Sequence, residues 1–285
     1  MDIERVLRRS GGAAHRADLI RSGVGPDEMA AALQSGNVIK PYRGVFALRG
    51  VPPQVSLATY FRAQQSCVTA AHAHGIALLE APDLVHLEVE QGRGSHYRPS
   101  AARAQTVIHR SRSHHGGGRL ATPMRAIDMA SRCVEPRTQL VMIDSALRRG
   151  LVTRSELREL VLTPGPVAAW LERHADGRAE SVPETCARVA LVSAGMRVTL
   201  QQWFEGIGRV DMVVEGRVVV ECDGREYHSD DRAFSRDRWR DRQLLSLGLP
   251  VMRFTYADAV FHPELLVQDV KRLLATRSVW PTDAT

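Results

Sequence analysis

The sequence predicts a mixed α/β protein, and three patterns along the chain carry this prediction. Residues 179–278 show a helix, a β-hairpin, a helix, a strand and a helix, with two valine-rich strands expected to lie in a buried sheet. Residues 1–50 alternate short amphipathic helices with a β-wing, as in a winged helix. Residues 51–165 mix strand and helix signals, which predicts an α+β middle region. Proline and glycine interrupt residues 165–178, so we expect a domain boundary there.

The individual elements follow from hydrophobic periodicity, turn residues and helix caps. In residues 1–50 a helix is expected to open at Pro26 and a β-wing to span residues 38–46. In the middle region and the C-terminal region the expected helices are 67–79, 124–132, 140–149, one begun at Thr153, 183–194, one from 229 or 230 to 248, and one from 263; the expected strands are 85–89, 106–109, 210–214, 217–222 and 251–254.

The composition favours an anionic partner. The chain has 285 residues, a formal net charge of +6 and only two lysines, Lys40 and Lys271, with a pI of about 9.5. This excess of arginine suits nucleic acid, because the guanidinium group matches phosphate geometry. A GC-rich genome would enrich arginine equally well, and composition leaves both explanations open.

The four cysteines and the N-terminus favour a cytoplasmic protein. Cys67, Cys133, Cys186 and Cys222 show no C-x-x-C spacing, so we expect reduced thiols and neither a zinc site nor a disulfide set. The N-terminus lacks the apolar stretch of a signal peptide. No apolar run reaches the roughly 20 residues that cross a bilayer, so a membrane partner is not expected.

Three acidic side chains end the two valine-rich strands. Asp211 begins the first strand, and Glu221 and Asp223 end the second, two residues apart and therefore on one face. Buried unpaired carboxylates are costly to desolvate, and a divalent metal removes that cost. The pattern therefore indicates a metal-binding centre. Exposed strand ends whose acids pair with nearby arginines are the alternative that the spacing leaves open.

About 95 residues of this region resemble the Vsr-like branch of the PD-(D/E)XK endonucleases. The matching segments are Glu184 on the first helix, Gly208-Arg209-Val210-Asp211, Glu221-Cys222-Asp223-Gly224-Arg225-Glu226-Tyr227-His228, Arg236-Asp237-Arg238, and 248–254. The resemblance implies a restriction-endonuclease-like α/β/α domain over 179–278, Mg²⁺ or Mn²⁺ as cofactor, DNA as partner, and phosphodiester hydrolysis.

The resemblance also implies roles for individual residues. Asp211 and Glu221 would hold the metal, and Glu184 would either complete the site or pair with Arg188. Asp223 stands where the wider superfamily has a lysine, and His228 is the substitute general base or phosphate contact, unless it is a surface histidine ahead of a helix. The expected phosphate contacts are Arg225, Arg236 and Arg240; for the last two, which are four residues apart, a solvated helix face is the alternative.

The metal site sets a condition on the hairpin. A two-residue turn at Glu215-Gly216 would pair Asp211 with Val220 and turn its side chain away from Glu221. A bulge or a three-residue loop would instead pair Asp211 with Glu221, and Gly216 makes such a loop inexpensive. The hypothesis therefore predicts the second register.

The first 50 residues and parts of the middle region resemble AbiEi-type antitoxins and transcriptional regulators. The matching segments are 17–24, 36–39, 43–46, 70–76, 122–130 and 144–150. The resemblance implies DNA binding and a toxin or other protein partner. The helix begun at Pro26 carries two acids and no basic residue, so base readout is not expected from it. Lys40, Arg43 and Arg49, in or beside the wing, would contact phosphate, or the domain would contact protein instead.

Two functions follow from these observations. The first is a DNA-binding protein whose C-terminal domain is a magnesium-dependent endodeoxyribonuclease. The second is a transcriptional regulator or antitoxin, in a toxin–antitoxin or phage-defence system, whose nuclease fold is inactive. The acidic residues favour the first function, and the missing lysine favours the second.

Overall fold

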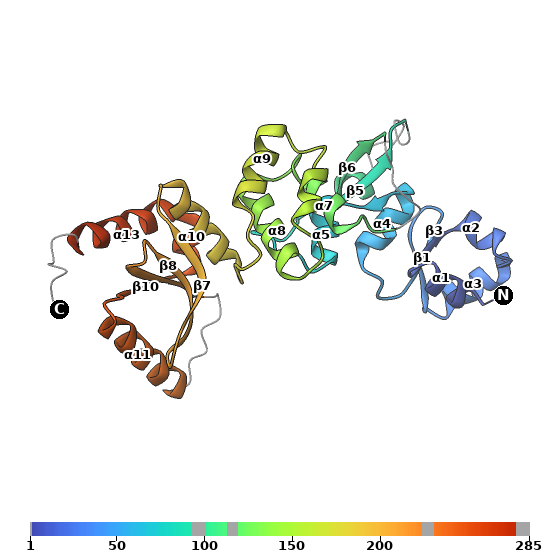
Figure 1. Cartoon of the computed structure of the whole chain (residues 1–285). Helices are drawn as coiled ribbons and strands as arrows, with labels where there is room; N and C mark the ends of the chain where they lie inside the picture. Colours follow the sequence, from blue (N-terminus) through green and yellow to red (C-terminus); the bar gives the residue numbers. More distant parts are fainter. Residues whose placement is uncertain (1, 93–100, 113–118, 224–230, 278–285) are drawn as a thin grey trace. The chain divides into compact units, whose positions relative to one another are not determined.

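The protein is described by a computed structural model that covers residues 2–92, 101–112, 119–223 and 231–277, the backbone alone for 231–235 and 277. The contacts within the chain divide it into two compact units. The first unit comprises residues 1–75 and 80–133, and the second comprises residues 76–79 and 134–285. Figure 1 colours both units along the sequence.

The N-terminal part of the first unit packs three helices against a small sheet (Figure 1). Its elements are α1 (Ile3–Arg9), β1 (Ala13–His15), α2 (Arg16–Arg21), α3 (Pro26–Gln34), β2 (Val38–Tyr42) and β3 (Val45–Leu48). The sheet order is β1-β3-β2 with antiparallel pairs. Leu7, Leu19 and Met29 from the helices pack with Phe46 from the sheet, so the apolar faces expected from the sequence form one core.

The rest of the first unit surrounds a second small sheet. Its elements are α4 (Pro53–Phe61), β4 (Gln64–Gln65), α5 (Cys67–Ala73), β5 (Val85–Glu90), α6 (Ala101–Ala104), β6 (Thr106–Ser111) and α7 (Pro123–Ala130). Strand β5 lies at the centre, antiparallel to β4 and parallel to β6. The two strands expected here are confirmed, whereas the helix expected over 67–79 ends earlier, at Ala73.

The second unit begins with a helical segment that comprises α8 (Pro136–Arg148), the 3₁₀ helix η1 (Ser155–Glu159) and α9 (Gly165–His174). The Glu156 side chain accepts hydrogen bonds from Thr153, as the capping pattern predicts, but only a single 3₁₀ turn follows. The boundary expected at 165–178 falls inside this unit, because Pro166 opens α9 in its first turn instead of ending the structure.

A four-stranded mixed sheet forms the C-terminal part of the second unit. Its elements are α10 (Val182–Ser193), β7 (Val198–Phe204), β8 (Gly208–Val214), β9 (Val218–Cys222), α11 (Asp231–Ser246), β10 (Val251–Phe254), α12 (Tyr256–Phe261) and α13 (Pro263–Arg277). The order is β10-β9-β8-β7, with β10 parallel to β9 and the other pairs antiparallel. The expected helix, hairpin, helix, strand and helix are confirmed, and β7 is an additional strand.

Helices cover both faces of this sheet, so the fold is α/β as expected (Figure 1). On one face Met212 and Val220 pack with Leu191 of α10 and Leu266 of α13. On the other face Val213 and Val219 pack with Leu244 of α11. Burial on both faces explains why the two strands are valine-rich along their whole length. Across the described residues, no helix is long and apolar enough to cross a lipid bilayer.

Candidate functional site

The hairpin β8–β9 has the register that a shared acidic centre requires. Val214 pairs with Val218 and Met212 with Val220, so a three-residue loop joins the strands. Continued by one residue beyond the last observed pair, this register brings Asp211 opposite Glu221. Glu215 and Gly216 have φ angles of 52° and 65° in this loop. Residues directly opposite each other project from one face of a sheet. The left-handed loop therefore sets the register that brings Asp211 toward Glu221, and the charge of Asp211 acts on the Glu221 carboxyl.

The alternation of side chains along β8 is interrupted around Asp211. Val210 packs in the same cluster as Val213, three residues away, whereas Met212 packs on the opposite face of the sheet. Opposite the interruption on β7 lies Gln201, which has a φ of 53°. Irregularities of this kind redirect a side chain. The Asp211 carboxylate turns toward the hairpin partner and accepts a hydrogen bond of 2.9 Å from the Cys222 backbone N–H.

Asp211 and Glu221 both have a raised pKa. Burial raises the pKa of Asp211, against the hydrogen bond from Cys222. Burial likewise raises the pKa of Glu221; the charges of Arg253 and Arg240 offset part of this shift, and the charge of Asp211 adds to it. Both effects disfavour the ionised carboxylate in the absence of a cation. A hard divalent cation has the chemistry that would stabilise these groups in their charged form.

Glu184 joins the centre from the first turn of α10. Its carboxylate accepts hydrogen bonds from the Glu180 backbone N–H at 2.9 Å, from the Ser181 hydroxyl at 2.7 Å and from the Gln201 amide at 2.8 Å. Burial raises the pKa of Glu184, and the nearby Asp211 charge also raises it. The alternative pairing with Arg188 is not formed, because Arg188 pairs with Asp144 at 2.7 Å.

Arginine side chains neutralise Glu221. Arg253, its direct partner on β10, approaches one carboxylate oxygen at 2.8 Å, and Arg240 of α11 approaches the other at 3.4 Å. Arg253 also lies 3.7 Å from Asp223 and 2.9 Å from Asp241. The alternative of acids paired with arginines, which the sequence left open, is thus realised at Glu221. Arg253 was not expected from the sequence, since its pairing depends on the parallel strand β10.

A pocket of about 790 Å³ adjoins this group of charges. Its lining carries acids and arginines in equal number together with an apolar wall: Asp223, Asp237, Asp241, Arg238, Arg242, Arg253, Leu245, Pro250 and Val251. Asp223 and Arg253 belong to this lining, so a ligand in the pocket would meet the edge of the acidic centre.

The remaining expected site residues lie in several places. His228 and Arg225 fall outside the described residues. Arg236 is exposed on α11, whereas Arg240 is half-buried and also donates to the Arg209 backbone carbonyl at 2.6 Å. In the first unit, Lys40 on β2 and Arg43 in the β2–β3 turn are exposed. The structure thus brings Asp211, Glu221, Glu184, Asp223 and Arg240 together, and it keeps Arg236 at the surface.

Comparison with known proteins identifies the class of the C-terminal domain. Residues 185–274 match the restriction-endonuclease-like family REase_MTES_1575. The C-terminal part of the second unit is therefore a nuclease-like domain, and the match extends from α10 to α13.

The curated relatives that the chain resembles include two uncharacterized proteins of Mycobacterium tuberculosis, MT2308 and Rv2248. Each is 33% identical over 170 residues, which cover 55% of this chain and 62% of the relative. The chain thus spans about three fifths of the length of these relatives.

Proposed function

We propose that the nuclease-like domain is a metal-dependent endodeoxyribonuclease, and that Asp211 and Glu221 are its central acids. The observation that carries this proposal is the three-residue loop of the buried hairpin, because its register, continued past Met212 and Val220, brings Asp211 opposite Glu221. Asp211, Glu221 and Glu184 are the residues that would hold Mg²⁺ or Mn²⁺. When bound, such an ion polarises a phosphate and lowers the pKa of a bound water.

The chain's own residues would organise the reaction around these acids. The Cys222 N–H orients Asp211 and the Gln201 amide orients Glu184, each through one hydrogen bond. Arg253 and Arg240 are the described cations nearest to Glu221, so they are candidates for the charge that lysine supplies in the wider superfamily. His228 remains the proposed general base.

We further propose that residues 1–50 form a winged helix that delivers DNA to this domain. The element order α1-β1-α2-α3-β2-β3 and the sheet order β1-β3-β2 support this proposal. The exposed side chains of Lys40 and Arg43 beside the wing would contact phosphate. DNA is then the partner, and the cytoplasm the site of action. The resemblance to AbiEi-type proteins adds a toxin or other protein as a second proposed partner.

The second candidate is a DNA-binding regulator or antitoxin whose nuclease fold is inactive. The observation that favours it is the full pairing of Glu221 with Arg240 and Arg253, which leaves neither carboxylate oxygen without a cationic neighbour. In this case Mg²⁺ would have to displace two arginines before it could bind.

The experiment that separates the two candidates is a cleavage assay with the purified full chain. Supercoiled, linear and single-stranded DNA are incubated with Mg²⁺ or Mn²⁺, and Glu221→Gln is compared with Glu215→Gln. Glu215 lies in the same hairpin and pairs with the exposed Arg197, so its substitution is a matched control. We expect cleavage that Glu221→Gln abolishes and Glu215→Gln preserves. Absence of cleavage on every substrate, with salt-sensitive binding retained, would favour the regulator.

A further inference from the structure

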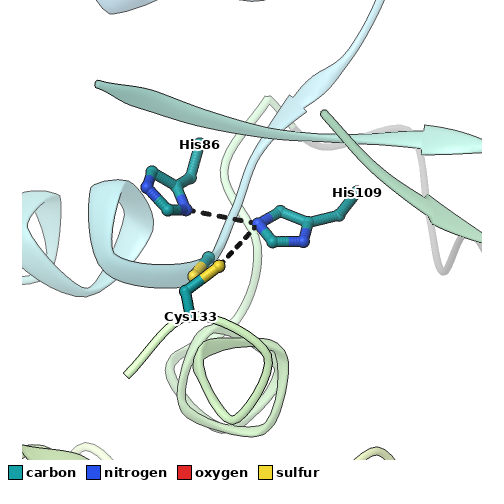
Figure 2. A group of neighbouring side chains, drawn as sticks. His86, His109 and Cys133 are labelled. Carbon is teal, nitrogen blue, oxygen red and sulfur yellow. Dashed lines mark hydrogen bonds between the residues drawn. The ribbon is translucent and has the colours of Figure 1, made fainter. Parts of the chain in front are cut away.

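Four side chains with metal-binding chemistry converge in the first unit. One each comes from α5, β5, β6 and the segment after α7. They are Cys67, His86, His109 and Cys133, and one donor atom from each lies within 4.8 Å of the other three. Among the described residues, these are the histidine, cysteine or acidic side chains that gather in a group of three or more, close enough to hold one metal ion. Figure 2 shows His86, His109 and Cys133 turned toward one another.

The parallel register of β5 and β6 places both histidines on one face. His86 pairs with Val107, and His109 lies two residues beyond Val107 on the same strand. Side chains two residues apart share a face, and paired residues project together. The two rings therefore extend from the same side of the sheet, and both are buried.

The two cysteines reach this face from the helices beside it. The Ser66 N–H donates to the His86 carbonyl at 3.0 Å, which fixes the chain one residue before Cys67. Cys67 then adopts a left-handed φ of 54° and is fully buried. Cys133 follows α7, where its N–H donates to the Ala130 carbonyl at 2.8 Å. A left-handed cysteine is a strained conformation that the surroundings must stabilise.

The distances between donor atoms fit a tetrahedral ion. For Zn–N and Zn–S bonds of roughly 2.05 and 2.3 Å, a tetrahedron separates two nitrogens by about 3.3 Å and a nitrogen from a sulfur by about 3.6 Å. Nδ1 of His86 lies 3.2 Å from Nε2 of His109, and Sγ of Cys133 lies 3.8 Å from the same Nε2. The three side chains thus have nearly the spacing that zinc would impose.

A buried polar network fixes the backbone around the four side chains. Glu88, two residues after His86 on β5, is buried and pairs with Arg125 of α7 at 2.5 Å. Glu88 also accepts from the Ser66 hydroxyl at 3.3 Å, and Thr69 of α5 accepts from the His86 N–H at 2.8 Å. These contacts connect α5, α7 and the sheet, so Cys67, His86 and His109 lie on packed elements, and Cys133 lies in the turn directly after α7.

We propose that Cys67, His86, His109 and Cys133 together bind one Zn²⁺ in a closed structural site. Two sulfurs and two nitrogens in a tetrahedral arrangement are a set that zinc prefers. Four protein ligands leave no open position, so the ion stabilises the fold and takes no part in DNA hydrolysis. The site joins the turn after α7 and the start of α5 to strands β5 and β6 of the first unit. The proposal departs from the sequence-based expectation of reduced thiols without a zinc site, because it makes Cys67 and Cys133 zinc ligands.

The test is the metal content of the purified full chain after dialysis, measured by elemental mass spectrometry. We expect about one zinc ion per chain. Cys133→Ser and His109→Asn should both lose it. Cys186→Ser, a buried cysteine elsewhere, and His72→Asn, an exposed histidine on α5, should both retain it. Glu221→Gln should also retain it, which separates this site from the acidic centre.

Cobalt provides a second readout that does not depend on how well a variant folds. Co²⁺ added to metal-free wild-type protein should develop the visible bands of a tetrahedral ion and the charge-transfer absorption of thiolate ligands. Three results would overturn the proposal. They are a wild-type chain that neither contains zinc nor gives the cobalt spectrum, zinc retained in full by Cys133→Ser and His109→Asn, and a Cys67–Cys133 disulfide found in the intact mass of zinc-free protein.

Discussion

The side-chain amide of Gln201 donates a hydrogen bond of 2.8 Å to Glu184, although the Gln201 backbone is in the left-handed region with a φ of 53°. Left-handed residues other than glycine cost on the order of 1–2 kcal/mol. Gln201 also lies opposite the interruption of β8 at which Asp211 turns toward the hairpin. A strained residue that contacts one acid and faces another is a candidate positioning residue for the acidic centre.

Two substitutions at Gln201 separate its strain from its hydrogen bond. Gln201→Ala and Gln201→Gly both remove the donor to Glu184, so both should lower cleavage to a similar extent. Glycine adopts a positive φ without strain, so Gln201→Gly should be more stable than Gln201→Ala by about 1 kcal/mol. Urea unfolding and DNA cleavage measure the two effects.

The neighbouring Gln202→Ala provides the control, because Gln202 lies on the same strand in regular pairing with Val210. Its cleavage rate should match that of the wild type. Equal stability of the alanine and glycine variants at position 201 would show that the left-handed conformation stores no energy.

Breaking the buried ion pair between Asp144 and Arg188 should strongly destabilise the second unit. Their side chains are 1% and 7% exposed, and Asp144 also accepts from Thr185 at 2.9 Å and from the Asp176 N–H at 2.7 Å. Asp144→Asn leaves the Arg188 charge buried without compensation, which costs about 3–5 kcal/mol. Chemical denaturation measures this loss.

The double variant Asp144→Asn with Arg188→Met should recover part of that stability, because no uncompensated charge remains. The exposed pair of Arg158 and Glu172 serves as a comparison, with side chains 78% and 43% exposed. Glu172→Gln should change the unfolding free energy by no more than about 1 kcal/mol. If Asp144→Asn lowered the unfolding free energy by no more than Glu172→Gln does, the buried-charge argument would be contradicted.

His15 should make the N-terminal part of the first unit less stable at mildly acidic pH. Burial, followed by the charge of Arg62, lowers the pKa of His15 below its usual 6.5, and Asp18 offsets part of this shift. The unfolded chain then takes up the proton first. The contribution of His15 to the free energy of unfolding is fully present above pH 6.5. It is lost as the pH falls through the lower pKa of His15 in the folded state.

Hydrogen exchange of the β1 and β3 amides, corrected for the intrinsic effect of pH, measures this dependence. The loss of protection between about pH 7.5 and about pH 5.5 should be smaller in His15→Gln than in the wild type. The comparison isolates His15, because every other histidine is the same in both proteins. Identical pH profiles would exclude a contribution from His15.

The wing should contribute to DNA affinity without choosing a sequence. Lys40 and Arg43 are exposed there, whereas Arg49 is held by a hydrogen bond of 2.6 Å to the Gly36 carbonyl. Lys40→Ala and Arg43→Ala should each weaken DNA binding by the same factor for duplexes of unrelated sequence. Each should also reduce the slope of log affinity against log salt by about 1.

Fluorescence anisotropy at several salt concentrations measures these slopes. Arg8→Ala is the control in the same part of the unit, because Arg8 pairs with Glu4 on α1 at 2.6 Å. Its slope should remain that of the wild type. If one wing substitution weakened only one DNA sequence, the side chain would be reading bases instead of phosphates.

Local patterns were sufficient to predict much of the nuclease-like domain. Hydrophobic runs bounded by glycine and charged residues placed the β8–β9 hairpin and β10 to within about two residues. The register of Asp211 and Glu221 could also be stated as a condition, because side chains alternate along a strand and Gly216 permits a left-handed loop. These features depend on residues that are near each other in the sequence, where sterics and periodicity act directly.

The tertiary structure alone decided the contacts between distant segments. Arg253 reaches Glu221 because β10 pairs in parallel with β9, and Gln201 reaches Glu184 because an unpredicted strand crosses beside α10. Cys67 and Cys133 showed no metal-binding spacing, yet the packing of α5 and α7 on one sheet brings them together. Such contacts follow from how elements pack, and no local pattern in the chain specifies that packing.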